Sequence, residues 1–84
     1  MQRYYVNCGS INPKTLSIKK ITFGKSMPSG NYIVSLTISG APAYWADVDI
    51  AVSDKTKTGF TINLFNSSDY TVNDIYIDWI AISY

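Results

Sequence analysis

Aspartate supplies every acidic side chain of this 84-residue sequence, which contains neither glutamate nor histidine. Catalytic triads, typical zinc sites and the usual acid–base pairs need histidine or glutamate, so the composition excludes most catalytic chemistry. Asp47 and Asp49 are two residues apart on an expected strand, where they would share one face and could act as a glycosidase-like carboxylate pair. Because that face is expected to meet water, we interpret both carboxylates as solubilising groups and predict that the protein is not an enzyme.

Neither a metal site nor a reactive thiol is expected. Aspartate-rich loops can bind calcium, but the segment 54–57 carries two lysines that would repel the ion, and the segment 69–74 lacks the dense spacing of oxygen ligands. Cys8 is the only cysteine, so no internal disulfide can form. Without a histidine to act as its base, Cys8 is interpreted as a small apolar residue on a strand. We predict no metal and no cofactor.

Trp45 leaves two interpretations open. It follows Ala41-Pro42-Ala43-Tyr44 in an expected loop, where an exposed indole could stack on a sugar ring or a protein partner. The same indole could instead fold back and cap one end of the domain. A different signal, Asn66-Ser67-Ser68, matches a glycosylation sequon and is interpreted as turn chemistry.

The elements that must position these residues are strands. Turn residues recur at short intervals, and the stretches between them are rich in Ile, Val, Thr and Tyr, which favour strands over helices. The six expected strands are residues 3–8, 17–23, 32–39, 47–53, 58–65 and 74–83. In the second strand, Ile18 does not share the alternation of Ile21 and Phe23, which predicts a bulge near Lys19-Lys20. We predict a single all-β domain, 1–84, built as a six-stranded antiparallel β-sandwich, with a small barrel as the alternative.

The last strand is apolar on both faces. Ile75, Ile77, Trp79 and Ala81 form one series, which is expected to face the core. The other series also becomes apolar towards its end, and a chain this small has no second layer to cover it. We therefore predict that another copy of the chain covers this face, through contacts that include the residues Tyr76, Ile80, Ile82 and Tyr84.

Charge and hydropathy exclude two classes of partner. The net charge is +1 with no clustered basic face, which argues against nucleic acid. No apolar run reaches the roughly 18 residues of a membrane span, so no membrane insertion is expected. The N-terminus lacks the apolar core of a signal peptide.

Four stretches of the sequence carry a family resemblance: Ile21-Thr22-Phe23, Tyr32-Ile33-Val34-Ser35-Leu36, Thr58-Gly59-Phe60-Thr61 and Asp78-Trp79-Ile80-Ala81-Ile82. They resemble the H-type lectin domain, a family that includes snail agglutinins and has related modules at the C-terminal tips of phage tail fibres. The resemblance runs from about Val6 to Tyr84. It implies a six-stranded antiparallel sandwich, a trimer, and sugar sites near the subunit boundaries.

The resemblance also implies two binding loops. Gly9, Ser10 and Asn12 match the first by position, and Asn66, Ser67, Ser68 and Asp69 match the second. Such small polar groups suit sugar hydroxyls, although turns need them for local reasons as well. The agglutinins have a Trp-His pair where this sequence has Ser67-Ser68, so their specificity for N-acetylgalactosamine does not carry over.

Two functions from different classes follow. The first is a carbohydrate-recognition module, the receptor-binding C-terminal tip of a phage or phage-like tail fibre, whose partner is a cell-surface glycan or another surface receptor. The alternative is a structural trimerisation or capping domain of a fibre without a sugar ligand. Both place the protein on a virion tail fibre or outside the cell.

Overall fold

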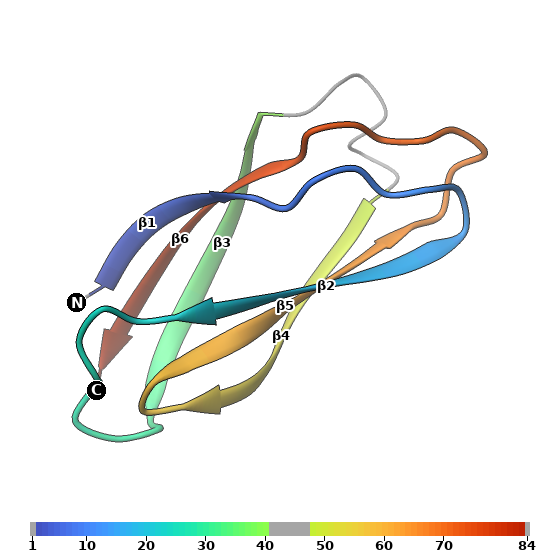
Figure 1. Ribbon diagram of the computed structural model, residues 1–84. Helices are drawn as coiled ribbons and strands as arrows, with labels where there is room; N and C mark the ends of the chain where they lie inside the picture. The colour runs from blue at the N-terminus through green and yellow to red at the C-terminus, as the bar shows by residue number, and fades with distance from the viewer. Residues whose placement is uncertain (1, 41–47, 84) are drawn as a thin grey trace.

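The computed structural model describes residues 2–40 and 48–83, and these form six strands in two sheets (Figure 1). The strands are β1 Gln2–Asn7, β2 Thr15–Thr22, β3 Tyr32–Gly40, β4 Val48–Thr56, β5 Gly59–Asn66 and β6 Tyr76–Ser83. The described residues contain no helix, so none that could span a membrane. The all-β fold and the six predicted strands are confirmed, with shifts of one to three residues at most of their ends.

Each sheet has three strands, and every pairing is antiparallel. The first sheet has the order β1-β6-β3 and the second the order β2-β5-β4. Figure 1 shows the two sheets as separate layers, with β1 and β2 as edge strands on the same side of the sandwich. This arrangement confirms the sandwich rather than the barrel.

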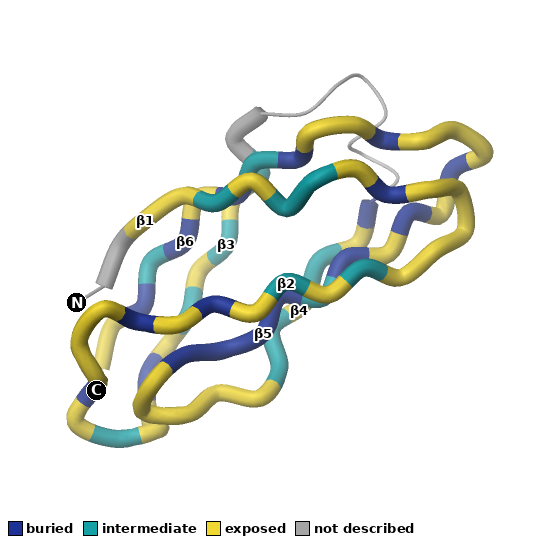
Figure 2. The backbone as a smooth tube through the Cα atoms, viewed as in Figure 1, coloured by how far each residue is buried: buried dark blue, intermediate teal, exposed yellow. Residues whose placement is uncertain are grey.

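Alternation along β6 places one series of side chains in the core. Ile77 and Ala81 are fully buried and Trp79 is 5% exposed, whereas Asp78 and Ile82 on the other face are exposed. The same alternation of buried and exposed residues is visible along the chain in Figure 2. The predicted orientation of the last strand is therefore confirmed.

Aromatic rings fill the space between the sheets. Phe23 contacts the rings of Tyr32, Phe60 and Trp79, with ring centroids 5.6, 5.9 and 5.7 Å away. The hydroxyl of Tyr32 lies 2.8 and 2.7 Å from the carbonyl oxygens of Thr56 and Gly59, so its polar end is satisfied within the core. This cluster joins both sheets at the end where β4 turns into β5.

The predicted bulge near Lys19-Lys20 is wrong. β2 pairs with β5 in unbroken register from Thr15 opposite Asn66 to Thr22 opposite Gly59. The sequence is out of step because Ile18 points away from the core and is 62% exposed. An apolar residue on the outer face of a regular strand produced the same pattern as an extra residue would.

Candidate functional site

The two loops expected to bind ligand lie side by side at one end of the sandwich (Figure 1). Ile11 and Val72 form an isolated antiparallel bridge, with N···O distances of 2.8 and 3.0 Å. Next to it, the amide of Cys8 donates to the carbonyl of Ile75 at 2.7 Å, and the amide of Ile75 donates to the carbonyl of Gly9 at 3.0 Å. Backbone pairing thus brings together the two groups of residues that the sequence placed about 55 positions apart.

Asn66 holds this pair of loops together from the inside. It is 0% exposed, and its Nδ2 group donates to the carbonyls of Ile11, Asn12 and Tyr70 at 3.0, 3.3 and 2.7 Å. Its Oδ1 atom accepts from the amide and the hydroxyl of Ser68 at 2.9 and 2.6 Å. The amide is satisfied within the protein, so the interpretation of the sequon as turn chemistry holds.

The remaining predicted residues differ in accessibility. Ser68 is 7% exposed and is used within its own turn, so it presents no group to a ligand. Gly9 is half-buried, with a positive φ of 76° that suits glycine. The exposed members of the two loops are Ser10, Asn12, Ser67 and Asp69. We call these four residues the turn-loop surface.

Lys14 adds a cation to the turn-loop surface. Its Nζ atom donates to the carbonyl of Ser67 and lies 3.7 Å from Oδ1 of Asp69. Both side chains are well exposed, at 61% and 87%, and such a pair contributes little to stability because water screens it. Lys14 was missed in the sequence because the two loops meet only in the folded chain.

The predicted trimer residues lie on the outer face of the first sheet. Tyr76 and Ile80 are half-buried and Ile82 is 48% exposed. Ile33 of β3 lies opposite Ile82 and is 60% exposed. These four residues are called the β6 face below. Tyr84 lies outside the described residues, as do Trp45 and Asp47.

A second outward apolar surface was not expected. Leu16 and Ile18 of β2 are 56% and 62% exposed, and Phe65 of β5 lies opposite Leu16 and is 37% exposed. This β2/β5 face lies on the outer side of the other sheet. The sequence did not indicate this face because the spacing of Ile18, Ile21 and Phe23 predicts a bulge rather than an outward-facing Ile18.

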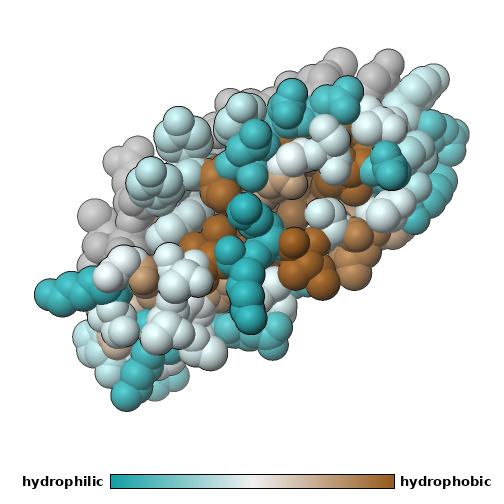
Figure 3. All heavy atoms as spheres, viewed as in Figure 1, coloured by the Kyte–Doolittle hydropathy of each residue, from teal (hydrophilic) through white to brown (hydrophobic). Residues whose placement is uncertain are grey.

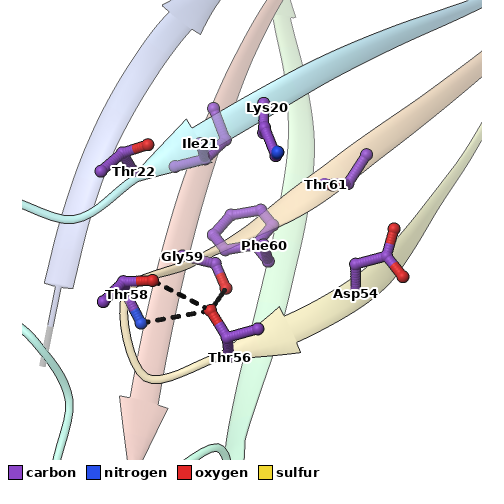
Figure 4. Close-up of a pocket in the computed structure, with 9 residues that line it drawn as sticks. All are labelled: Lys20, Ile21, Thr22, Asp54, Thr56, Thr58, Gly59, Phe60 and Thr61. Atoms are coloured by element: carbon purple, nitrogen blue, oxygen red, sulfur yellow. Dashed lines mark hydrogen bonds between the residues drawn. The ribbon is translucent and has the colours of Figure 1, made fainter.

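A pocket of about 350 Å³ lies beside the turn between β4 and β5 (Figure 4). We call it the threonine pocket because its lining residues include Thr22, Thr56, Thr58 and Thr61. Oγ1 of Thr56 bonds to Oγ1 of Thr58 at 3.1 Å and to the carbonyl of Gly59 at 3.3 Å. These hydroxyls thus stabilise the turn, and without histidine or glutamate the pocket has no ordinary acid–base pair.

A larger groove of about 460 Å³ runs between the free edges of β1 and β2. Its lining includes Tyr4, Tyr5, Lys19, Lys20, Phe23 and Trp79, and it is called the edge groove below. Figure 3, which views the same side as Figure 1, shows apolar side chains around a central column of hydrophilic ones. Sequence reasoning missed this groove because β1 and β2 belong to different sheets and are not paired with each other.

Cys8 is half-buried, packs against the core and is a free thiol. Burial raises the pKa of the Cys8 thiol, and the nearby charge of Lys19 partly offsets that rise. A thiol with a raised pKa is a poor nucleophile near neutral pH. Among the described residues, no group of three potential metal ligands is found.

Solved tail-fibre structures share this fold. The chain matches a structure described as an N-truncated R1-type pyocin tail fibre, with a TM-score of 0.72 and 23% identity over 99% of this chain and 69% of that one. It matches a P. aeruginosa R1 pyocin fibre structure comprising C-terminal residues 323–701 equally well, with a TM-score of 0.72 and 23% identity. That second match covers 99% of this chain and 22% of the longer one. The likeness establishes a common fold.

No family model matches the chain, and no curated protein matches it significantly. The resemblance to H-type lectins therefore stays a prediction, whereas the similarity to fibre modules is now supported by the fold.

Proposed function

We propose that this domain is a receptor-binding module of a phage-like tail fibre, which acts as a homotrimer and binds carbohydrate on a cell surface. The observation that carries the proposal is the match of 99% of the chain to R1 pyocin fibre fragments at a TM-score of 0.72. As part of a fibre, the domain would lie outside the host cell. The absence of histidine and glutamate supports a binding rather than a catalytic role.

The turn-loop surface supports carbohydrate as the ligand. It offers hydroxyl, amide and carboxylate groups next to the ammonium of Lys14. A sugar hydroxyl can donate to the carboxylate, accept from the ammonium, and do either with the hydroxyl and amide groups. Asn66 fixes the backbone beneath these groups, so they are held in place before a ligand arrives. A shallow site of this kind binds one sugar weakly, with a Kd on the order of 1 mM. Three copies facing a dense glycan could raise the apparent affinity by about 10².

The experiment is a surface-polysaccharide array probed with the assembled protein. Binding should fall in a variant that combines Asn12→Ala and Asp69→Ala. Both side chains are exposed, and the double substitution leaves the Asn66 side chain in place. Lys57→Ala, an exposed position near the opposite end, is the matched control and should bind as well as the native protein. If the folded trimer binds no polysaccharide and no cells, the carbohydrate proposal is wrong.

A structural role is the second candidate, and the two outward apolar faces favour it. The β6 face and the β2/β5 face expose several large apolar side chains on one 84-residue domain. Exposed apolar patches commonly mark contacts with other proteins. A capping domain would trimerise and complete the fibre without a ligand. Its deletion would abolish fibre assembly, whereas loss of a receptor-binding module would leave assembled fibres that do not attach.

A further inference from the structure

We propose that the edge groove binds a single sugar unit that carries a carboxylate or a phosphate. The groove measures about 460 Å³, which falls within the range of small-molecule sites and suffices for one sugar ring. It is a different surface from the turn loops, so the two binding proposals can fail independently. Three features of the groove define the class of ligand.

The first feature is an inward-facing lysine. Lys19 lies directly opposite Ile62 in the β2–β5 pairing, and Ile62 is fully buried, so both side chains point between the sheets. Lys19 is half-buried, and within the described part of the chain its ammonium group has neither an ion pair nor a hydrogen bond. Lys20 contributes to the rim of the groove but alternates to the outer face of β2, where it also lines the threonine pocket beside Asp54. Lys19 is therefore the cation that points into the groove, and none of the groove's lining residues is acidic. A cationic groove without a carboxylate favours an anionic ligand.

The second feature is the ring of Tyr4, which lies opposite the core residue Trp79 and so points to the groove side of β1. Tyr5 lies opposite the exposed Asp78, and its ring contacts Tyr76 of the β6 face. Tyr4 and Tyr5 are 69% and 58% exposed, with ring centroids 6.0 Å apart and planes inclined by 12°. Phe23 and Trp79 lie deeper and are nearly buried. Exposed tyrosines combine a flat apolar surface with a hydroxyl group, and this combination suits the apolar face and the hydroxyls of a sugar ring.

The third feature is the unpaired backbone at the rim. β1 and β2 are each the outer strand of a sheet on the same side of the sandwich. Edge strands present alternating N–H donors and C=O acceptors that have no partner within the sheet. Sugar hydroxyls act both as donors and as acceptors, so a polyhydroxylated ring can pair with such a rim.

The test is a titration of the assembled protein with four probes: glucuronate, glucose 6-phosphate, glucose and adenosine monophosphate. Two-dimensional amide NMR would report both affinity and location. The two charged sugars should bind at least about tenfold more tightly than glucose, since a hydrogen bond to a charged group is stronger than a neutral one. The shifts should gather at Tyr4, Lys19 and the indole N–H of Trp79. Comparison of the two charged sugars shows whether the carboxylate or the phosphate is preferred.

Two lysine variants test whether the groove carries the preference for charged sugars. Lys19→Met keeps the length of the aliphatic stem and removes the charge, and its spectrum shows whether the fold is retained. It should lose the preference, whereas Lys57→Met, at an exposed position outside both the groove and the turn loops, should keep it. An unchanged preference in folded Lys19→Met would overturn the proposal, as would equal binding of glucose. Tighter binding of adenosine monophosphate that depends on Lys19 would overturn it too, because the site would then suit nucleotides.

Discussion

The indole of Trp79 meets the ring of Phe60 edge-on, with ring centroids 5.3 Å apart and planes at 83°. Trp79 belongs to the first sheet and Phe60 to the second, so this contact links the two layers. Edge-to-face pairs add to the stability that apolar burial supplies. We expect the pair to be central to the stability of the sandwich.

Trp79→Ala should unfold the domain or come close to it. Loss of a buried aromatic side chain costs about 3–5 kcal/mol, which rivals the whole stability of a small domain. Urea denaturation followed by circular dichroism measures the effect. Trp79→Phe is the control, and it should retain the fold with a smaller loss. A folded and stable Trp79→Ala protein would mean that the core does not depend on this ring.

Asn66→Ala should destabilise the protein by about 1–3 kcal/mol. The carbonyls of Ile11 and Tyr70 would each lose one of two donors in a buried place, and the amide and hydroxyl of Ser68 would lose the oxygen that accepts from them. Asn73→Ala makes the same change at an exposed position and should change the free energy of unfolding by less than about 0.5 kcal/mol. Equal denaturation midpoints for the two variants would show that Asn66 does not hold the loops together.

Gly59→Ala should also destabilise the fold. A Cβ atom at this position would lie 1.9 Å from the carbonyl oxygen of Ile21, so the paired strands β2 and β5 would have to separate. Strain of this kind costs about 1–3 kcal/mol. At Gly24 an added Cβ meets nothing within 4 Å, so Gly24→Ala serves as the control and should leave the thermal midpoint nearly unchanged. If Gly24→Ala lowered the thermal midpoint more than Gly59→Ala, the close packing of β2 against β5 would be contradicted.

Cys8 should react slowly with thiol reagents near pH 7. Burial raises the pKa of its thiol above the ordinary value of 9.0, so the reactive thiolate is scarce. The alkylation rate of the folded protein should stay below that of the urea-unfolded chain, and it should continue to rise with pH above 9, where the rate of the unfolded chain levels off. Because the raised pKa belongs to the folded state, its contribution to stability is complete below pH 9 and is lost as the pH rises further. Equal rates for the folded and unfolded chains would contradict this burial.

The strands could be predicted because alternation along β3, β4 and β6 follows their burial closely. The outward β2/β5 face could not, since Ile18 is apolar and exposed, and only the register with β5 shows which way it points. Likewise, the sequence indicated that Asn66 belongs to a turn. It could not indicate that the amide contacts the carbonyl of Ile11, 55 positions away in the chain. Contacts between distant segments define both the turn-loop surface and the edge groove, so neither could be located from local pattern alone.

Ile80→Asp should dissociate the proposed trimer, because it places a charge within the β6 face. Ile18→Asp makes the same change at an outward apolar position of the other sheet, so it should leave the trimer intact. Size-exclusion chromatography with light scattering compares the two variants. Dissociation by Ile18→Asp alone would move the proposed interface to the β2/β5 face.

The most direct test of a trimeric fibre module is the molar mass of the native protein in solution, measured by light scattering. A value near three times the 9.4 kDa of the chain is expected. A mass of about 9.4 kDa at all accessible concentrations would contradict the trimer and leave the β6 face open to water.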